Sequence, residues 1–381
     1  MTPPVRRGLR VAVVANTAWY LVNFRLNLMV ALRDAGCEVL AVAPADAHVQ
    51  RLNDAGLAFA AITLSGSGTN PLTEMRSVAA LSRVLRLHRT ELVLSYTPKG
   101  NLYAALACIF AGRAFVPNVS GLGRSFIRRN WVTPVVTLMY RATFGRALRV
   151  FFQNQDDLDA FVRARLVPLA LTERLPGSGV DLAHFVPLPQ PTNNADAPVF
   201  LLIARMLWDK GVGEFVAAAR RVRQAFPGSR FVLLGFADVA NPSAISRQQL
   251  DAWSAEGVVS VCPPVDDVRP WLAQADCVVL PSYREGVPRT LLEAAACARP
   301  VITTDAPGCR DTVVHGQTGF LCRVRDADDL AARMLEFIAL PVEQRQQMGL
   351  AGRAFVEANF DERQVIARYL EAASAAAASA D

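Results

Sequence analysis

The chain has 381 residues, of which 52% are hydrophobic and 19% are charged, and its formal net charge is +6. This length is about two and a half times that of a usual domain, so we expect two domains, and the composition excludes an intrinsically disordered chain. No apolar run approaches the ~18 residues of a membrane-spanning helix, and residues 11–15 form too short a run for the core of a signal peptide. We therefore expect a soluble, intracellular protein.

The seven cysteines are widely spaced and contain no CxxC pair. This spacing excludes a disulfide framework and a zinc ribbon, so we expect reduced thiols that pack as small hydrophobic side chains.

Positive charge is concentrated in the first half of the chain. Residues 1–170 contain 20 Lys and Arg against 9 Asp and Glu, a net charge of +11, whereas the remainder contains 20 against 25, a net charge of −5. Such an asymmetry indicates that the first half meets an anionic partner, for which nucleic acid and a membrane surface are the candidates. Only two of the 40 cationic residues are lysines, Lys99 and Lys210.

Short apolar runs rich in Val, Leu and Ile alternate with longer amphipathic stretches from end to end. We expect strands at residues 9–15, 39–43, 58–64, 91–95, 115–119, 150–152, 199–204, 230–235, 258–261, 276–280, 301–303 and 319–322. Helical patterns lie between them, for example at residues 22–35, 72–88 and 213–225. Apolar strands that alternate with helices predict an α/β chain with doubly wound parallel sheets.

The domain limits follow from composition and from the strand pattern. The proline-rich stretch 187–194 has no periodicity and is expected to link two doubly wound domains. We assign residues 1–167 to an acceptor- and membrane-facing domain, 168–355 to a nucleotide-sugar-binding domain, and 356–381 to a helix that returns to the first domain. In such folds ligands bind at the carboxyl ends of the strands, so the site is expected in a cleft between the domains.

The densest site signal is the segment 281–294, which follows an expected strand. Pro288 is placed where the first turn of a helix tolerates proline, and Glu285 and Gly286 lie in the loop before it. The loop offers backbone N–H groups and a helix dipole to an anion, and Glu285 and Glu293 offer carboxylates to sugar or ribose hydroxyls. The alternative is a helix N-terminus that favours acidic residues for structural reasons alone.

The second signal is the segment 205–211, which also follows an expected strand. Arg205 and Lys210 are two cations five positions apart, and such a pair in a strand-to-helix loop is suited to a diphosphate. The alternative is an ordinary solvated loop.

Together these motifs resemble the retaining glycosyltransferases of family 4. The resemblance rests on Arg205, Lys210-Gly211, the segment 281–288, and the seven residues between Glu285 and Glu293. Further matches are Gly179-Val180-Asp181 with Phe185, the segment 300–302, and Pro307-Gly308. In the first half, residues 97–103 and 118–123 look like the branch that elongates lipid-linked bacterial glycans.

The resemblance implies the GT-B architecture, in which two Rossmann-like domains face each other across a cleft. It implies that Arg205 and Lys210 hold the donor diphosphate, that Glu285 contacts the transferred sugar, and that Glu293 binds the nucleotide ribose. The remaining donor-binding residues implied are Gly286, Val287, Pro288, Arg289, Thr290 and Asn16. Contacts with the acceptor or with phosphate are expected at Lys99, Ser120 and Gly121.

Metal and dinucleotide motifs are absent or better explained otherwise. The pairs Asp157/Asp159 and Asp326/Asp328 match a metal-binding DxD pattern, but both open helical stretches where Asp is a normal cap. No glycine fingerprint for a dinucleotide follows the first strand. We therefore expect neither a metal nor an organic cofactor.

A basic and aromatic segment at residues 123–131 predicts a membrane contact. Arg124, Arg128 and Arg129 stand beside Trp131 and other apolar residues, which suits an anionic bilayer surface. The alternative is an amphipathic helix with a solvated rim. Nucleic acid is excluded as a partner because no recognition module accompanies the arginines.

The sequence thus predicts a metal-independent hexosyltransferase bound peripherally to the inner, cytoplasmic face of the plasma membrane. It is expected to move an N-acetylhexosamine or hexose from a UDP-sugar, with retention, to a saccharide linked to polyprenyl diphosphate or to lipid A core. The pathways implied are lipopolysaccharide, capsule or protein-glycan biosynthesis. The alternatives are a UDP-sugar 2-epimerase of the same architecture and a non-catalytic subunit that binds nucleotide.

Overall fold

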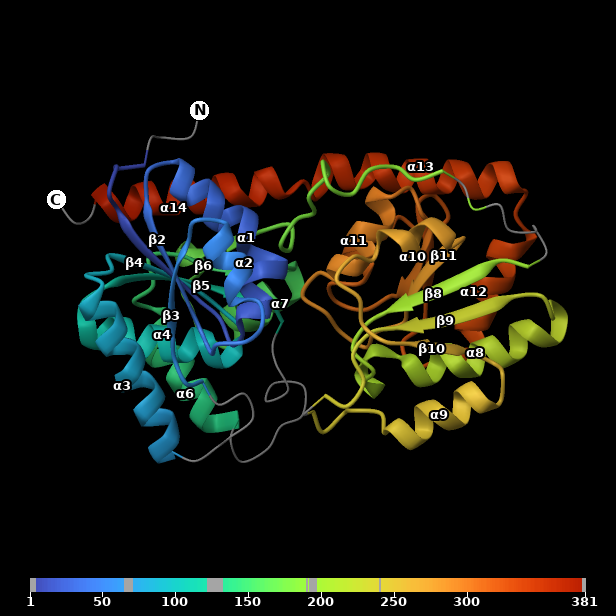
Figure 1. The fold of residues 1–381 in the computed structure, drawn as a ribbon, viewed down its shortest axis with the longest axis horizontal. Coiled ribbons are helices and arrows are strands. Elements are labelled where there is room, and N and C mark those ends of the chain that lie inside the picture. Colours follow the sequence, from blue (N-terminus) through green and yellow to red (C-terminus); the bar gives the residue numbers. More distant parts are fainter. Residues whose placement is uncertain are drawn as a thin grey trace. The chain divides into compact units, whose positions relative to one another are not determined.

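The computed structural model describes residues 5–64, 71–121, 133–189, 191, 197–239 and 241–378. Their contacts divide the chain into two units. Unit 1 comprises residues 1–178 and 363–381, and unit 2 comprises residues 179–362. Each unit is built on one parallel sheet with helices on both faces (Figure 1).

Unit 1 contains seven parallel strands in the order β3-β2-β1-β4-β5-β6-β7. The strands are β1 (Arg10–Val14), β2 (Glu38–Ala43), β3 (Ala58–Ala61), β4 (Leu92–Tyr96), β5 (Ala114–Val119), β6 (Val150–Phe152) and β7 (Thr172–Arg174). The helices are α1 (Ala18–Asp34), α2 (Val49–Asp54), α3 (Pro71–Leu87), α4 (Pro98–Ala111), α6 (Thr133–Phe144), α7 (Gln155–Arg163), the 3-10 turn η1 (Leu169–Leu171) and α14 (Glu362–Ala378).

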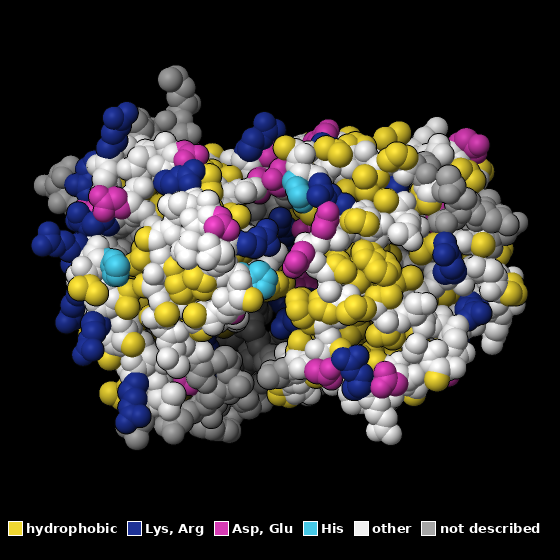
Figure 2. Space-filling model, in the orientation of Figure 1, with side chains coloured by type: hydrophobic (Ala, Val, Ile, Leu, Met, Phe, Trp, Pro, Cys, Tyr) yellow, Lys and Arg dark blue, Asp and Glu magenta, His cyan; other side chains and the backbone are white. Residues whose placement is uncertain are grey.

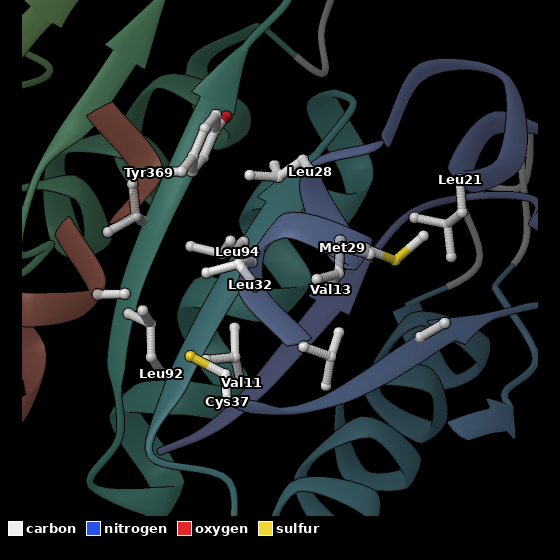
Figure 3. Packing of buried hydrophobic residues seen from close by; sticks show 14 of the residues in the cluster. Val11, Val13, Leu21, Leu28, Met29, Leu32, Cys37, Leu92, Leu94 and Tyr369 are labelled. Atoms are coloured by element: carbon white, nitrogen blue, oxygen red, sulfur yellow. The ribbon is translucent and has the colours of Figure 1, made fainter. Parts of the chain in front are cut away.

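Alternate residues of the buried strands in unit 1 point into two separate cores. Val11 and Val13 of β1 pack with α1, α2 and α14 on one face of the sheet, whereas Ala12 and Val14 pack with α3, α4, α6 and α7 on the other. Tyr369 of α14 lies beside the strands with Leu92 and Leu94 (Figure 3). Because side chains alternate across a strand, burial on both faces requires apolar runs without alternation.

Unit 2 contains six parallel strands in the order β10-β9-β8-β11-β12-β13. The strands are β8 (Val199–Ile203), β9 (Arg230–Leu234), β10 (Ser260–Cys262), β11 (Cys277–Leu280), β12 (Val301–Thr304) and β13 (Gly319–Cys322). The helices are α8 (Val212–Ala225), α9 (Arg247–Ala255), α10 (Arg269–Gln274), α11 (Arg289–Ala296), α12 (Ala327–Ala339) and α13 (Val342–Asn359), with 3-10 turns η2 (Trp208–Lys210) and η3 (Arg310–Thr312).

Unit 2 also has a core on each face of its sheet. Phe200 and Leu202 of β8 pack with α8, α9 and α12, and Leu201 packs with α10, α11 and α13. All seven cysteines of the chain are free thiols, as expected, and most are buried. Burial raises the pKa of Cys309 to about 12, so this thiol remains neutral near pH 7.

The chain crosses between the units at residues 178–179 and 362–363. The two crossings pair within unit 2, where the Val180 amide donates to the Phe360 carbonyl at 2.9 Å and the Glu362 amide donates to the Val180 carbonyl at 3.2 Å. Gly179 has φ +70°, and a Cβ there would lie 2.3 Å from the Glu362 Cα. Glycine is therefore required at this crossing.

The expected α/β architecture of two parallel sheets is confirmed, and each of the twelve expected strands has a counterpart. The thirteenth strand, β7, escaped prediction because Thr172–Arg174 is an edge strand without a buried residue. Within the described part of the chain, no helix is both long and apolar enough to cross a membrane.

Candidate functional site

The strand order of unit 2 reverses at β8. The chain continues from β8 to its neighbour β9 on one side and later returns to place β11 on the other side. In open parallel sheets this switch point leaves a crevice at the carboxyl ends of the two central strands. The loops that begin there are residues 204–211 after β8 and 281–288 after β11, and these are the two segments with the strongest sequence signals.

These two loops are in direct contact. Gly211 caps η2 with φ +72°, and a Cβ at this position would lie 2.1 Å from the Pro281 carbonyl oxygen. The Asp209 carbonyl accepts a hydrogen bond from the Tyr283 amide at 3.0 Å and lies 3.2 Å from the Ser282 hydroxyl oxygen. The backbone of the first loop is thereby fixed against that of the second.

The contact brings together two of the expected site residues. The Lys210 ammonium forms an ion pair with Oε1 of Glu285, and the buried Ser282 hydroxyl donates to the same oxygen at 2.6 Å. The side chains of Lys210 and Glu285 are 19% and 14% exposed. Partial burial strengthens such a pair relative to a surface ion pair and still leaves it accessible to a ligand.

A third loop, which follows β12, packs against the loop that carries Glu285. The Glu285 amide donates to the Pro307 carbonyl at 3.1 Å. Gly308 has φ +79°, and a Cβ there would lie 2.2 Å from the Gly286 carbonyl oxygen. The hydroxyl of Thr304, at the end of β12, donates to the Ser282 carbonyl. The loop after β12 therefore leaves no room for the Glu285 loop to move toward it.

Arg205 differs from Lys210 in its surroundings. Its side chain is exposed, and it makes no hydrogen bond or ion pair with any other residue in the described part of unit 2. Arg205 follows the carboxyl end of β8, and no ion pair in the described part of the chain compensates its charge.

The remaining expected donor-binding residues of unit 2 lie at the start of α11. Gly286 and Val287 are buried in the loop, Pro288 is the N-cap residue, and Arg289 and Thr290 open the first turn. One turn later, Glu293 is 12% exposed and lies 2.8 Å from Nε of Arg289. Burial raises the pKa of Glu293, and the neighbouring Arg289 partly offsets this effect.

In unit 1 the switch point lies between β1 and β4. Asn16 is exposed just after β1, Lys99 opens α4 just after β4, and Ser120 and Gly121 follow β5, so all four lie at the carboxyl edge of this sheet. Thr97, immediately after β4, has φ 68° and ψ 149°, a region that non-glycine residues seldom occupy outside functional sites.

Lys99 has a carboxylate partner that the sequence did not reveal. Its ammonium lies 3.0 Å from Oε1 of Glu74 in α3, and the Tyr103 hydroxyl donates to the other oxygen of Glu74. Lys99 is 34% exposed and Glu74 is 18% exposed. Glu74 is 25 positions away in the chain, and no local pattern pointed to it.

The expected membrane residues Arg124, Arg128, Arg129 and Trp131 lie outside the described residues. Of the two aspartate pairs, Asp326 accepts from the amides of residues 328 and 329 as the cap of α12. Asp157 lies in the first turn of α7, which Asn154 caps. Among the residues that the structure describes, no three His, Cys, Asp or Glu side chains are grouped to hold a metal ion.

Two doubly wound parallel sheets in one chain define a two-domain protein of the GT-B architecture. Residues 22–177 match the family described as "Glycosyl transferase 4-like domain", and residues 197–339 match "Glycosyl transferases group 1". The chain therefore belongs to the glycosyltransferases of these two domain families, and the family expected from the motifs is confirmed.

Individual relatives agree with this assignment. The chain is 29% identical to an N,N'-diacetylbacillosaminyl-diphospho-undecaprenol alpha-1,3-N-acetylgalactosaminyltransferase of Campylobacter jejuni over 95% of its own length and 98% of that protein. It shares its fold with Anabaena HepE in complex with UDP-glucose, with a TM-score of 0.77, 20% identity, and coverage of 98% and 100%. It also shares its fold with a sucrose-phosphate synthase from Thermosynechococcus elongatus. The TM-score is 0.79, the sequence identity is 19%, and the match covers 99% of this chain and 100% of that one. The protein is a glycosyltransferase of bacterial glycan biosynthesis.

Proposed function

We propose that the protein transfers an N-acetylhexosamine or a hexose from a UDP-sugar to a lipid-linked saccharide, with retention of anomeric configuration and without a metal ion. The observation that carries this proposal is the Lys210–Glu285 pair at the switch point of unit 2, beside the uncompensated Arg205. The UDP-sugar is supported by HepE, which binds UDP-glucose in the same fold. The lipid-linked acceptor is supported by the Campylobacter relative, whose name gives N,N'-diacetylbacillosaminyl-diphospho-undecaprenol as its acceptor.

The donor would bind in unit 2 through charge and hydrogen bonding. Arg205 and Lys210 neutralise the diphosphate, and the carboxylate of Glu293 accepts hydrogen bonds from the ribose hydroxyls. Glu285 accepts from hydroxyls of the transferred sugar, an exchange for its present contacts with Lys210 and Ser282. The residues 286–290 hold the loop and the start of α11 around the phosphates. Asn16 adds a donor contact from unit 1.

The chemical step makes the glycosidic bond on the face from which the nucleotide departs. The bond between the anomeric carbon and the diphosphate oxygen breaks, the acceptor oxygen bonds to that carbon, and the acceptor proton passes to the departing phosphate. Negative charge then develops on the diphosphate, and fixed cations at Arg205 and Lys210 stabilise it without reorganisation. These two side chains supply the charge that a metal ion supplies in other transferases.

The acceptor would engage unit 1. We assign unit 1 to the acceptor and the membrane, and unit 2 to the donor, with α14 as the helix that returns to unit 1. Lys99, Ser120 and Gly121 contact acceptor or phosphate groups. Arg124, Arg128, Arg129 and Trp131 hold the protein against the anionic inner face of the plasma membrane, where a lipid-linked saccharide of lipopolysaccharide, capsule or protein-glycan assembly is presented.

A panel of UDP-sugars incubated with lipid extract from the native host tests this proposal. We expect one sugar to appear in the lipid fraction, with an α-linkage when the donor is an α-linked UDP-sugar, at the same rate in excess EDTA. Conversion of the donor to an epimer in the absence of lipid would instead identify a 2-epimerase. Donor binding without transfer to any lipid would identify a non-catalytic subunit. Loss of transfer in EDTA that manganese restores would overturn the metal-free step.

A further inference from the structure

Unit 1 contains a hollow of about 300 Å³ between the end of α6, the end of α7 and the segment that leads into β7. The residues that line it are Arg141, Gly145, Val162, Arg165, Leu166, Val167, Pro168 and Leu169. Two guanidinium groups and several apolar side chains share this wall, and none of the lining residues is acidic. The hollow therefore offers positive charge and apolar surface together.

The hollow lies at the amino edge of the sheet, away from the switch point. The end of α6 leads into β6, and the end of α7 leads into β7, so the residues between each helix and its strand lie where these parallel strands begin. Asn16, Lys99 and Ser120 follow the carboxyl ends of β1, β4 and β5. Opposite edges of one sheet separate the two groups, and the hollow is distinct from the proposed acceptor site.

The cations of the hollow are available to an anion. Nη2 of Arg141 donates to the Ala164 carbonyl at 3.0 Å, which fixes its guanidinium and leaves its other N–H donors. The exposed side chain of Arg165 makes no hydrogen bond or ion pair with the rest of the described unit. The nearest acidic residues along the chain are already paired, Asp159 with Arg163 at 3.9 Å and Glu173 with Arg149 and Arg368.

Exposed apolar side chains lie in the wall of the hollow and on the helix α6 that leads to it. Leu169 in its wall is 65% exposed. Leu138, which precedes Arg141 by one helical turn on the exposed side of α6, is 67% exposed, and Val135 one turn earlier is 52% exposed. On the face shown in Figure 2, dark blue Lys and Arg side chains are prominent over the part of unit 1 where Figure 1 labels β2, α3 and α4.

We propose that this hollow binds the phosphate of an anionic phospholipid, with Arg141 and Arg165 as the phosphate ligands and Leu138, Val135 and Leu169 in contact with the acyl region. Charge complementarity selects an anionic lipid, and the exposed leucines select a lipid over a free anion. The inference rests on the proposed membrane association, and it assigns part of the membrane contact to residues of α6 and of the hollow. Val135, Leu138 and Arg141 follow the expected membrane segment 124–131 in the sequence and lie on α6.

Sedimentation of the full-length protein with vesicles tests the inference. The vesicles contain either phosphatidylcholine alone or phosphatidylcholine with phosphatidylglycerol, and the double variant Arg141→Gln/Arg165→Gln and the single variant Leu138→Ser are compared with wild type. We expect the double variant to bind phosphatidylglycerol vesicles roughly thirty-fold more weakly, because each arginine near an anionic surface strengthens vesicle binding by a similar factor of about five to six. Leu138→Ser should weaken binding about ten-fold through lost apolar burial.

Matched controls lie on exposed positions of unit 2. Arg220→Gln/Arg247→Gln removes the same charge from ion pairs that are 42% and 57% exposed on their arginine side, and Leu350→Ser alters a leucine that is 57% exposed. These variants should bind vesicles as wild type does, and UDP affinity should be unchanged in all variants, which reports on the integrity of unit 2.

Several outcomes would overturn the inference. Equal losses in the control and test variants would show a general effect of charge, and undiminished binding of both test variants would remove the hollow from the contact. Saturable binding of inorganic phosphate that requires Arg141 and Arg165, with vesicle binding unaffected, would make the hollow a site for a free anion. Failure of the wild type to bind any vesicle would overturn both this inference and the proposed membrane association. The proposed sugar transfer is tested separately, with an acceptor solubilised in detergent.

Discussion

The Lys210 ammonium and the Glu285 carboxylate, 75 positions apart in the chain, form an ion pair where the loops after β8 and β11 meet. Ser282 donates to the same carboxylate oxygen, and Gly211 and Gly308 hold the two loops at backbone contact with their neighbours. The pair thus depends on the loops after β8, β11 and β12, three strands that are neighbours in the sheet. A ligand that pairs with Lys210 removes a hydrogen-bond donor from Glu285 and must supply another in its place. A sugar diphosphate has both an anion for Lys210 and hydroxyl groups for Glu285.

Replacement of either cation should reduce turnover while affecting stability differently. We expect Arg205→Ala and Lys210→Ala each to lower kcat by about 10² to 10³, because each removes a charge that, in the proposed reaction, stabilises the leaving diphosphate. Nucleotide affinity should fall far less.

Only Lys210→Ala should lower the Tm, because it leaves the partly buried Glu285 without its cation, whereas Arg205 is exposed and unpaired in the described structure. The double variant Lys210→Ala/Glu285→Gln should recover the Tm and remain inactive. Thermal melts and single-turnover assays measure the two effects. Retention of full turnover by either single variant would remove that residue from the leaving-group role.

The contact between Gly211 and Pro281 should be essential for the fold of unit 2. In Gly211→Ala the new Cβ would lie 2.1 Å from a carbonyl oxygen, in addition to the cost of φ +72°. Gly257→Ala is the matched control, because its φ is +70° and no atom lies within 4 Å of its Cβ. The control should cost about 1 to 2 kcal/mol for the left-handed conformation alone, and Gly211→Ala should cost more. Urea denaturation of both variants gives the comparison, and equal losses would show that the loops can separate.

The sequence predicted the sheets because parallel strands buried on both faces require continuous apolar runs, such as Val199–Ile203. It did not predict β7, whose three residues form an edge strand with no buried position. It also singled out the loops after β8 and β11 as candidates for the site, since each motif is contiguous, and the structure brings these two loops into contact.

Contacts between distant segments were beyond prediction. Ser282 and Gly308 lay inside recognised motifs, yet their roles follow from distances of a few ångströms to Glu285 and Gly286. Glu74 reaches Lys99 from a different helix, and a helical carboxylate carries no mark of its partner. Pairings of this kind are set by how the strands are ordered in the sheet.

The stability of the protein should depend on pH through Glu293. Burial raises the pKa of this carboxyl, so folding favours its protonated form, and the resulting stabilisation is present at low pH and lost as the pH rises through the raised value. Glu293→Gln should therefore raise the Tm more at about pH 8 than at about pH 4. Thermal melts of the wild type and of Glu293→Gln across this range measure the difference. A Tm difference independent of pH would show that Glu293 does not titrate on unfolding as inferred.

Lys99 should govern the acceptor and leave the donor unaffected. It opens α4 at the carboxyl end of β4, and its ion pair with Glu74 is exposed enough to contribute only about 0 to 1 kcal/mol to stability. We therefore expect Lys99→Ala to raise the acceptor KM about ten-fold, with an unchanged Tm, because a charge-assisted phosphate contact of roughly this strength is lost. UDP affinity, measured by calorimetry, should be that of the wild type.

Arg149→Ala is the matched control for Lys99→Ala, since it also breaks an ion pair, the one with Glu173. Arg149 lies just before β6, at the opposite edge of the same sheet, so its replacement should leave the acceptor KM unchanged. Glu74→Gln separates the two partners: it frees Lys99 from its carboxylate, so the acceptor diphosphate should bind more tightly if Lys99 contacts it. A large fall in Tm for Lys99→Ala, with full specific activity in the protein that stays folded, would assign Lys99 a structural role in joining α3 to α4.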